Sequence, residues 1–296
     1  MAFPSMAPRG ALLTGIAAAT LVAACAKSPA PAPPPPPPTA EAPAAPVTAA
    51  DGLSPAFHEA FAKADLRARA ITYWMQCVAT VARLRAGGTF GAAGSAPRAL
   101  YCERTGDGVP VGGVYDIDSS YRTVRRLSVV RLDGARARYT DALDTVRLAR
   151  SAKLARDVSK SISAAWAKKN HPFSVVPIVV NDTVEAWVMP RPSKARSFVT
   201  GGDVGYRLAA DGTPAVIDDR SATWTQLTLP ATGALTIYSS VKDVAAVADL
   251  VTARYQHDLA REVTVSTPAA ISTLVAGLDS TTGARVVWRH TPRKSP

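Results

Sequence analysis

The chain has 296 residues, of which 47% are hydrophobic, and its 34 Lys or Arg against 23 Asp or Glu give a formal net charge of +11. The apolar content is ordinary for a globular protein. Beyond the first fifty residues, the longest apolar candidate is 173–180, which is too short to span a bilayer and contains a proline. The 246 residues of 51–296 are enough for one large domain or two small ones with buried cores.

Residues 1–24 have the parts of a secretory signal. Arg9 supplies a positive charge near the start, and residues 11–24 contain no charged side chain. These fourteen residues fall short of the roughly 20 apolar residues that a bilayer-spanning helix needs. A basic start, a short apolar core and small residues before a cleavage site indicate a signal that is removed on export.

The stretch Leu21-Val22-Ala23-Ala24-Cys25 resembles the lipobox of bacterial lipoproteins. In that family the cysteine thiol is alkylated by diacylglyceryl, the signal is cut, and the new amine is usually acylated. The resemblance implies lipid attachment at Cys25 and a lasting membrane anchor, since several acyl chains hold far better than one. Ala26 replaces the Asp that favours inner-membrane retention, which implies an outer-membrane location facing the periplasm in a Gram-negative cell. The alternative is an ordinary signal peptide with a chance cysteine.

Residues 26–50 form a Pro/Ala-rich segment. It contains ten prolines, six of them consecutive at 33–38. Proline fixes φ and removes backbone donors, so this segment cannot form a helix or join a sheet. At about 3.1 Å per residue, it can extend roughly 75 Å. We interpret residues 25–50 as a lipidated cysteine followed by a disordered spacer; the alternative is a ligand for a proline-binding domain.

Residues 51–296 predict an α+β domain, either one unit or two subdomains of 51–170 and 171–296. Ser54 and Pro55 predict the start of a helix that continues to Leu84, as one helix or two. Further helices are expected over 143–169 and 241–255. Turns at Asp133-Gly134, Asn181-Asp182 and Asp211-Gly212 predict hairpins. The expected strands are 99–103, 111–116, 124–132, 135–139, 173–180, 183–189, 204–209, 215–218, 235–239, 262–266 and 284–290. Three principal helices among hairpins favour a mainly antiparallel sheet.

Two cysteines remain if Cys25 carries lipid. Cys77 and Cys102 are an even number in an oxidising compartment, which favours a disulfide between them. Closing a loop of about 26 residues stabilises a fold by roughly 3 kcal/mol in the chain-entropy model. The alternative is a pair of buried free thiols. Two cysteines without nearby histidines cannot complete a tetrahedral zinc site, so no metal is expected. No cofactor is expected either.

Basic residues concentrate in 121–170. This stretch holds thirteen Lys or Arg and four Asp, a net charge of +9. Such clustering is typical of nucleic-acid binding, but an exported domain meets little nucleic acid, so no such partner is expected. Anionic headgroups, lipid phosphates or wall-peptide carboxylates can accept the arginine hydrogen bonds instead. The expected partner is therefore the membrane, through the lipid anchor, with a component of the cell wall, a lipid or an envelope protein. The alternative is a solvated basic surface. The candidate surface consists of Arg136, Arg138, Arg147, Arg150 and Arg156.

No catalytic constellation is evident in the sequence. The four histidines, His58, His171, His257 and His290, lie far apart. His257-Asp258 is an adjacent pair, but no nucleophile elbow accompanies it. We therefore expect a binding domain rather than an enzyme. The alternative is an envelope hydrolase, which would need a cleft holding a titratable group such as His257 or Asp116.

The region 234–266 has a weak resemblance to the end of a JAB/MPN metalloprotease core. Its strand 235–239, helix and strand 262–266 follow the order of that family. The two metal-binding histidines of the family fall on Thr236 and Tyr238, and its serine falls on Ala246; only Asp249 matches. Without the imidazoles a zinc ion cannot be held, so the resemblance implies an inactive scaffold.

Overall fold

The computed structural model divides into two compact units, Met1–Pro46 and Val47–Pro296. All described residues belong to the second: 51–90, 98–104, 110–132, 144–169, 172–194, 196–230, 233–239, 244–258, 262–276 and 286–293. The predicted signal, Cys25 and the spacer lie outside the described residues. So do Arg136, Arg138, His171 and the predicted turn at Asp133-Gly134 with the strand after it. The ranges 51–170 and 171–296 belong to one compact unit.

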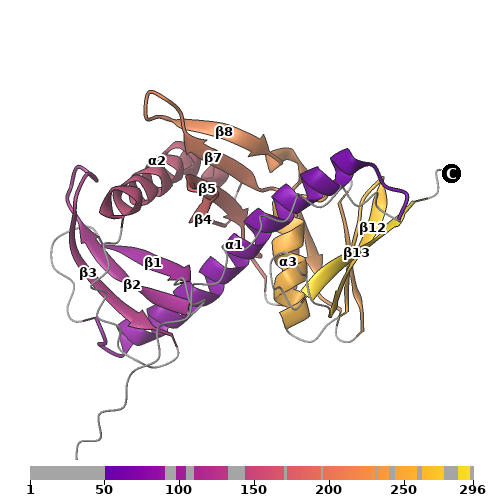
Figure 1. Ribbon diagram of the computed structural model, residues 1–296, viewed down its shortest axis with the longest axis horizontal. Helices are drawn as coiled ribbons and strands as arrows, with labels where there is room; N and C mark the ends of the chain where they lie inside the picture. The colour runs from indigo at the N-terminus through magenta and orange to yellow at the C-terminus, as the bar shows by residue number, and fades with distance from the viewer. Residues whose placement is uncertain are drawn as a thin grey trace, which may run out of the picture. The chain divides into compact units, whose positions relative to one another are not determined.

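Helix α1 (Pro55–Ala86) is a single long helix, the first of the two alternatives. The Ser54 hydroxyl caps it by accepting a hydrogen bond of 3.1 Å from the Phe57 backbone N–H, and Pro55 occupies the first turn. At the other end, the Gly87 backbone N–H donates to the Arg83 carbonyl oxygen. Figure 1 shows α1 running past all three larger sheets.

The first sheet is antiparallel, in the order β1 (Arg98–Arg104), β2 (Pro110–Ile117), β3 (Val124–Arg131). Helix α2 (Thr145–Lys169) covers one face, where Val111, Tyr115 and Ile117 pack on Leu148. The C-terminal half of α1 covers the other face. That contact consists of Cys77, Val81, Val114 and Val130.

The second sheet is also antiparallel, in the order β4 (Phe173–Val180), β5 (Thr183–Pro190), β7 (Val204–Leu208), β8 (Pro214–Asp219). The predicted β4–β5 turn is present, with φ of 47° at Asn181 and 59° at Asp182, as a two-residue hairpin turn requires. The other half of α2 packs on this sheet through Leu154, Val158 and Ile162. Beside it, β6 (Ser197–Thr200) pairs with β9 (Thr225–Thr228), which follows the short 3₁₀ helix η1 (Ser221–Thr223).

The third sheet has the order β10 (Leu235–Tyr238), β11 (Val263–Ser266), β12 (Ala270–Ala276), β13 (Val286–Pro292). β10 and β11 are parallel, joined through helix α3 (Val247–Asp258), and the other pairs are antiparallel. The largest core cluster joins this layer to the N-terminal half of α1 and to β4. Its largest members include Phe57, Phe61, Ile71, Trp187, Ile237 and Leu250.

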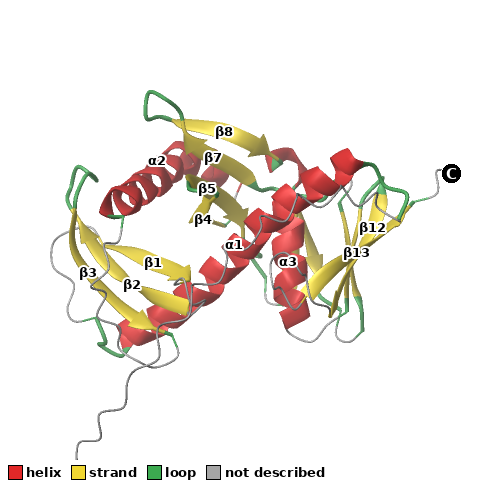
Figure 2. Ribbon diagram, in the orientation of Figure 1, coloured by secondary structure: helices red, strands yellow, loops and turns green. Residues whose placement is uncertain are grey.

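The structure confirms the α+β class with mainly antiparallel sheets (Figure 2). Three α-helices are present among the described residues, as predicted. Strands β6, β9 and β12 were not expected from the sequence. Helix α3 begins at Val247, six residues later than the predicted start at 241, and residues 244–246 before it are not helical.

Candidate binding pocket

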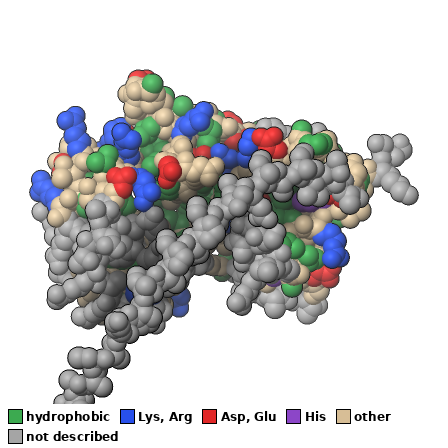
Figure 3. All heavy atoms as spheres, in the orientation of Figure 1, with side chains coloured by type: hydrophobic (Ala, Val, Ile, Leu, Met, Phe, Trp, Pro, Cys, Tyr) green, Lys and Arg blue, Asp and Glu red, His purple; other side chains and the backbone are tan. Residues whose placement is uncertain are grey.

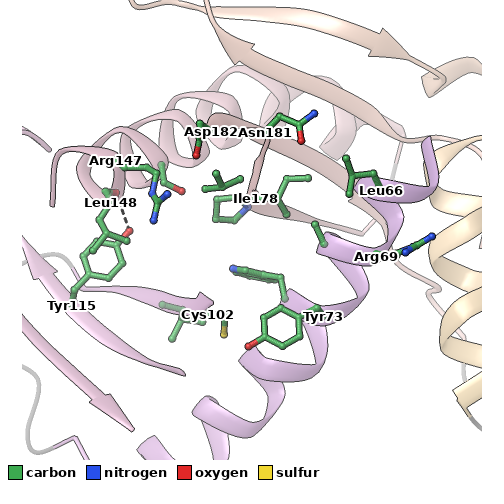
Figure 4. Close-up of a pocket in the computed structure, with 16 residues that line it drawn as sticks. Leu66, Arg69, Tyr73, Cys102, Tyr115, Arg147, Leu148, Ile178, Asn181 and Asp182 are labelled. Carbon is green, nitrogen blue, oxygen red and sulfur yellow. Dashed lines mark hydrogen bonds between the residues drawn. The ribbon is translucent and has the colours of Figure 1, made fainter. Parts of the chain in front are cut away.

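A cavity of about 560 Å³ lies beside the middle of α1, between the first two sheets and α2 (Figure 4). Its walls come from α1, β1, β2, α2 and β4. The side chains that line it are mainly aromatic and aliphatic. They include Leu66, Tyr73, Trp74, Leu100, Tyr115, Leu148, Ile178 and Val179. A volume of this size lies within the roughly 300–1,000 Å³ of small-molecule sites.

The mouth of this pocket is apolar. Leu66 on α1 and Val179 on β4 are each 40% exposed, although both are large hydrophobic side chains. Deeper in the pocket, the Tyr115 hydroxyl donates a hydrogen bond of 3.1 Å to the Leu148 carbonyl oxygen. Burial raises the pKa of Tyr115, so its phenol stays neutral. Tyr115 therefore adds no charge to the pocket, and the apolar side chains of Leu66 and Val179 reach the solvent.

Two arginines line the pocket, and they point in different directions. Arg147 extends from α2 into the cavity, whereas Arg69 extends from α1 away from its centre (Figure 4). The Arg69 guanidinium lies 2.8 Å from the Asp65 carboxylate and is committed to that ion pair. Arg147 therefore supplies the positive charge that faces the apolar chamber.

A second, smaller cavity of about 270 Å³ adjoins the first. Arg147 and Asp182 line both cavities. The smaller one adds Arg150 from α2 and Arg207 from β7, with Asp144 at the start of α2. Asp144 caps the helix, since its Oδ1 accepts a hydrogen bond of 2.8 Å from the Arg147 backbone N–H. In Figure 3, Lys and Arg side chains gather over this side of the molecule.

The structure brings together only part of the predicted arginine surface. Arg147 and Arg150 lie one turn apart and share the smaller cavity. Arg156 does not join them; its guanidinium stacks 4.1 Å from the centre of the Tyr121 ring and lies 2.7 Å from Asp157. Arg207 does join them, although no sequence signal connects β7 with α2.

The structure joins Cys77 and Cys102 in a disulfide. Cys77 lies in α1 and is buried, while Cys102 lies in β1 and lines the larger cavity. The bond therefore ties together two walls of the pocket.

Two buried carboxylates hold distant elements together. Asp65 is 2% exposed, and it accepts hydrogen bonds from Arg254 of α3 at 2.6 Å and from the Trp288 indole of β13 at 2.8 Å. Glu185 is 4% exposed and accepts from Arg67 and from the Trp187 indole, each at 2.8 Å. Their carboxylate oxygens are engaged within the protein, so both are structural groups.

Two histidines that are distant in the sequence meet at the start of α1. The His58 and His290 rings lie 5.5 Å apart, His58 lies 3.1 Å from Asp51, and His290 lies 2.8 Å from the Ser272 hydroxyl. Burial lowers the pKa of His290, and the nearby His58 lowers it further. Ser272 is fully buried, so this serine–histidine pair cannot reach a substrate.

The residues named for the hydrolase alternative do not line the two cavities. His257 is half-buried on α3, and Asp116 is half-buried on β2. The side chain of Asp258 lies outside the described residues. These positions assemble no nucleophile and base in the pocket.

The positions matched to the JAB/MPN pattern lie in different environments. Thr236 and Tyr238 lie on the exposed face of β10, opposite the buried Leu235 and Ile237. Asp249 is buried in α3, where its Oδ1 accepts a hydrogen bond of 2.9 Å from the Gly201 backbone N–H.

Asp249 has a buried acidic neighbour. Burial, together with the nearby charge of Asp249, raises the pKa of Asp203 to about 7. Asp203 is fully buried and does not line either cavity.

The described part of the chain lacks two further kinds of feature. It contains no helix long and apolar enough to cross a membrane. It also contains no group of three or more His, Cys, Asp or Glu side chains suited to holding a metal ion. No protein-family model, curated protein or solved structure matches the chain.

Proposed function

We propose that this chain is a lipid-anchored envelope lipoprotein whose exported domain binds a component of the bacterial envelope. Cys25 carries the lipid, residues 26–50 form the spacer, and the domain faces the periplasm from the outer membrane. The lipobox resemblance supports the anchor, and the pocket beside α1 supports binding. This function requires no catalytic group and no cofactor.

The observation that carries the binding function is the open apolar mouth of the pocket. An exported domain gains nothing in stability from exposing Leu66 and Val179 at the rim of a chamber lined by Tyr73 and Trp74. Concave sites lined by aromatic and aliphatic side chains, with a few placed polar groups, are typical of ligand binding. Arg147 is the arginine that extends into the chamber (Figure 4).

The anchor is tested by replacing Cys25 with Ser. We expect the variant to lose metabolic labelling by a palmitate analogue and to keep its signal uncut, because serine offers no thiol for thioether formation. Gel mobility and labelling measure both effects. A matched Ser28→Ala variant, three residues downstream, should label and mature normally. A Cys25→Ser variant that still carries label in the membrane fraction would refute the assignment.

Binding is tested in intact envelopes with a photo-crosslinking amino acid. We expect p-benzoylphenylalanine at Tyr73 to give a discrete adduct, because Tyr73 lines the pocket. The matched control places the same group at Tyr238, which is 64% exposed on β10. Mass spectrometry identifies the adducts. No adduct at position 73, or the same adducts at both positions, would contradict the binding function.

A further inference from the structure

The two adjoining cavities differ in chemistry. The larger one, between α1, β1, β2, α2 and β4, is lined mainly by aromatic and aliphatic side chains. The smaller one, at the start of α2, is lined by three arginines and two aspartates. Because Arg147 and Asp182 line both, the two cavities lie next to each other.

The arginines of the smaller cavity come from two elements that the fold brings together. Arg147 and Arg150 lie one turn apart on α2, and Arg207 lies on β7. Arg150 and Arg207 are exposed to solvent. Three guanidinium groups against two carboxylates leave this cavity positively charged. Guanidinium groups bind phosphate oxygens through paired, charge-assisted hydrogen bonds.

We propose that the pocket binds a phosphate-bearing acyl lipid, with its acyl chain in the larger cavity and its phosphate on Arg147, Arg150 and Arg207. This inference rests on the proposed function and names the class of envelope component that the domain takes. The apolar walls of the larger cavity suit the acyl chain of such a lipid, and the arginines of the smaller cavity suit its phosphate group. A free phosphate would leave the larger cavity empty, and an uncharged lipid would make no use of the excess positive charge around the smaller cavity.

The test uses two photoactivatable probes with the same diazirine-bearing acyl chain. One is a single-chain lysophosphatidic acid, and the other is the uncharged monoacylglycerol. The full chain, held in non-ionic detergent, is irradiated with each probe, and mass spectrometry locates the labelled peptides. We expect the phosphate probe to label peptides of α1 and β4 that line the chamber, about tenfold or more above the uncharged probe, because charge-assisted hydrogen bonds separate the two.

Two double variants that remove the same charge distinguish the effect of the arginines in the smaller cavity from the effect of net charge. Arg150→Ala with Arg207→Ala should reduce labelling by the phosphate probe about tenfold or more. Arg122→Ala with Arg289→Ala removes the same charge from two other exposed positions and should leave labelling unchanged. Arg147 is kept in both, because it also lines the apolar chamber.

Each remaining outcome overturns the lipid assignment and leaves the proposed function standing if Tyr73 still forms its adduct in envelopes. Equal labelling by both probes would show an apolar site that does not recognise the phosphate group of the lipid. If inorganic phosphate reduced labelling by the phosphate probe as strongly as unlabelled lysophosphatidic acid does, the site would bind phosphate without using the acyl chain. Labelling by neither probe would indicate another class of partner, such as an envelope protein. Loss of the Tyr73 adduct would instead count against the proposed function itself.

Discussion

Replacing Asp65 with Asn is expected to lower the free energy of unfolding by about 3–5 kcal/mol, the range for breaking one side of a buried ion pair. The buried Asp65 carboxylate neutralises Arg254, whose side chain is 11% exposed. It also accepts from the Trp288 indole and from Arg69. Asn keeps the size of the side chain but removes the charge and one acceptor oxygen, so the buried guanidinium loses its counter-charge.

Chemical denaturation of the full chain, followed by circular dichroism, measures this effect. The matched control is Glu59→Gln on the same helix, which breaks the Glu59–Lys63 pair of 2.6 Å whose side chains are 69% and 64% exposed. An exposed pair of this kind contributes little to stability, because water and salt screen its two charges. Equal losses for the two variants would contradict the structural role of Asp65.

The contacts of Asp65 could not be predicted from the sequence. Its partners Arg254 and Trp288 are 189 and 223 residues away, and a carboxylate on a helix face looks like any solvated acid in the sequence. The same holds for His58 and His290, which only the packing of α1 on the third sheet brings together. Local patterns carry no information on such pairs.

Elements with a local signal were predicted well. The cap at Ser54 and the turn at Asn181-Asp182 depend on neighbouring residues alone, so α1 and the β4–β5 hairpin followed from them. Strands β6 and β9 have four residues each and form by pairing with each other. Strand β12 is an exception, because its Ile271, Thr273 and Val275 favour a strand and it pairs with both β11 and β13, yet it was not predicted.

The pocket was predictable only at its charged edge. Clustering in the sequence pointed to Arg147 and Arg150, since residues three apart share a helix face. It also pointed to Arg156, which stacks on Tyr121 instead. The apolar chamber depends on the packing of α1, α2 and two sheets, so Tyr73, Trp74 and Arg207 carried no signal that would single them out.

Removing the Cys77–Cys102 disulfide is expected to lower the free energy of unfolding by about 3 kcal/mol, from the entropy that the bond removes from the unfolded chain. The two residues are 25 apart in the sequence, and the bond fixes β1 against α1. Cys102 also lines the larger cavity, so labelling by the phosphate probe should fall together with stability. Denaturation of the Cys77→Ala, Cys102→Ala double variant measures the first effect, and photolabelling measures the second.

A reductant distinguishes the effect of the disulfide bond from the effect of the packing of the two cysteine side chains. Dithiothreitol should destabilise the wild-type chain by nearly as much as the double substitution, because reduction opens the loop but keeps both side chains. The double variant should not respond to the reductant, since its remaining cysteine, Cys25, takes no part in this bond. If reduction leaves wild-type stability and labelling unchanged, the bond does not hold the two walls together, and the pocket depends on the packing of α1 against β1 and β2 alone.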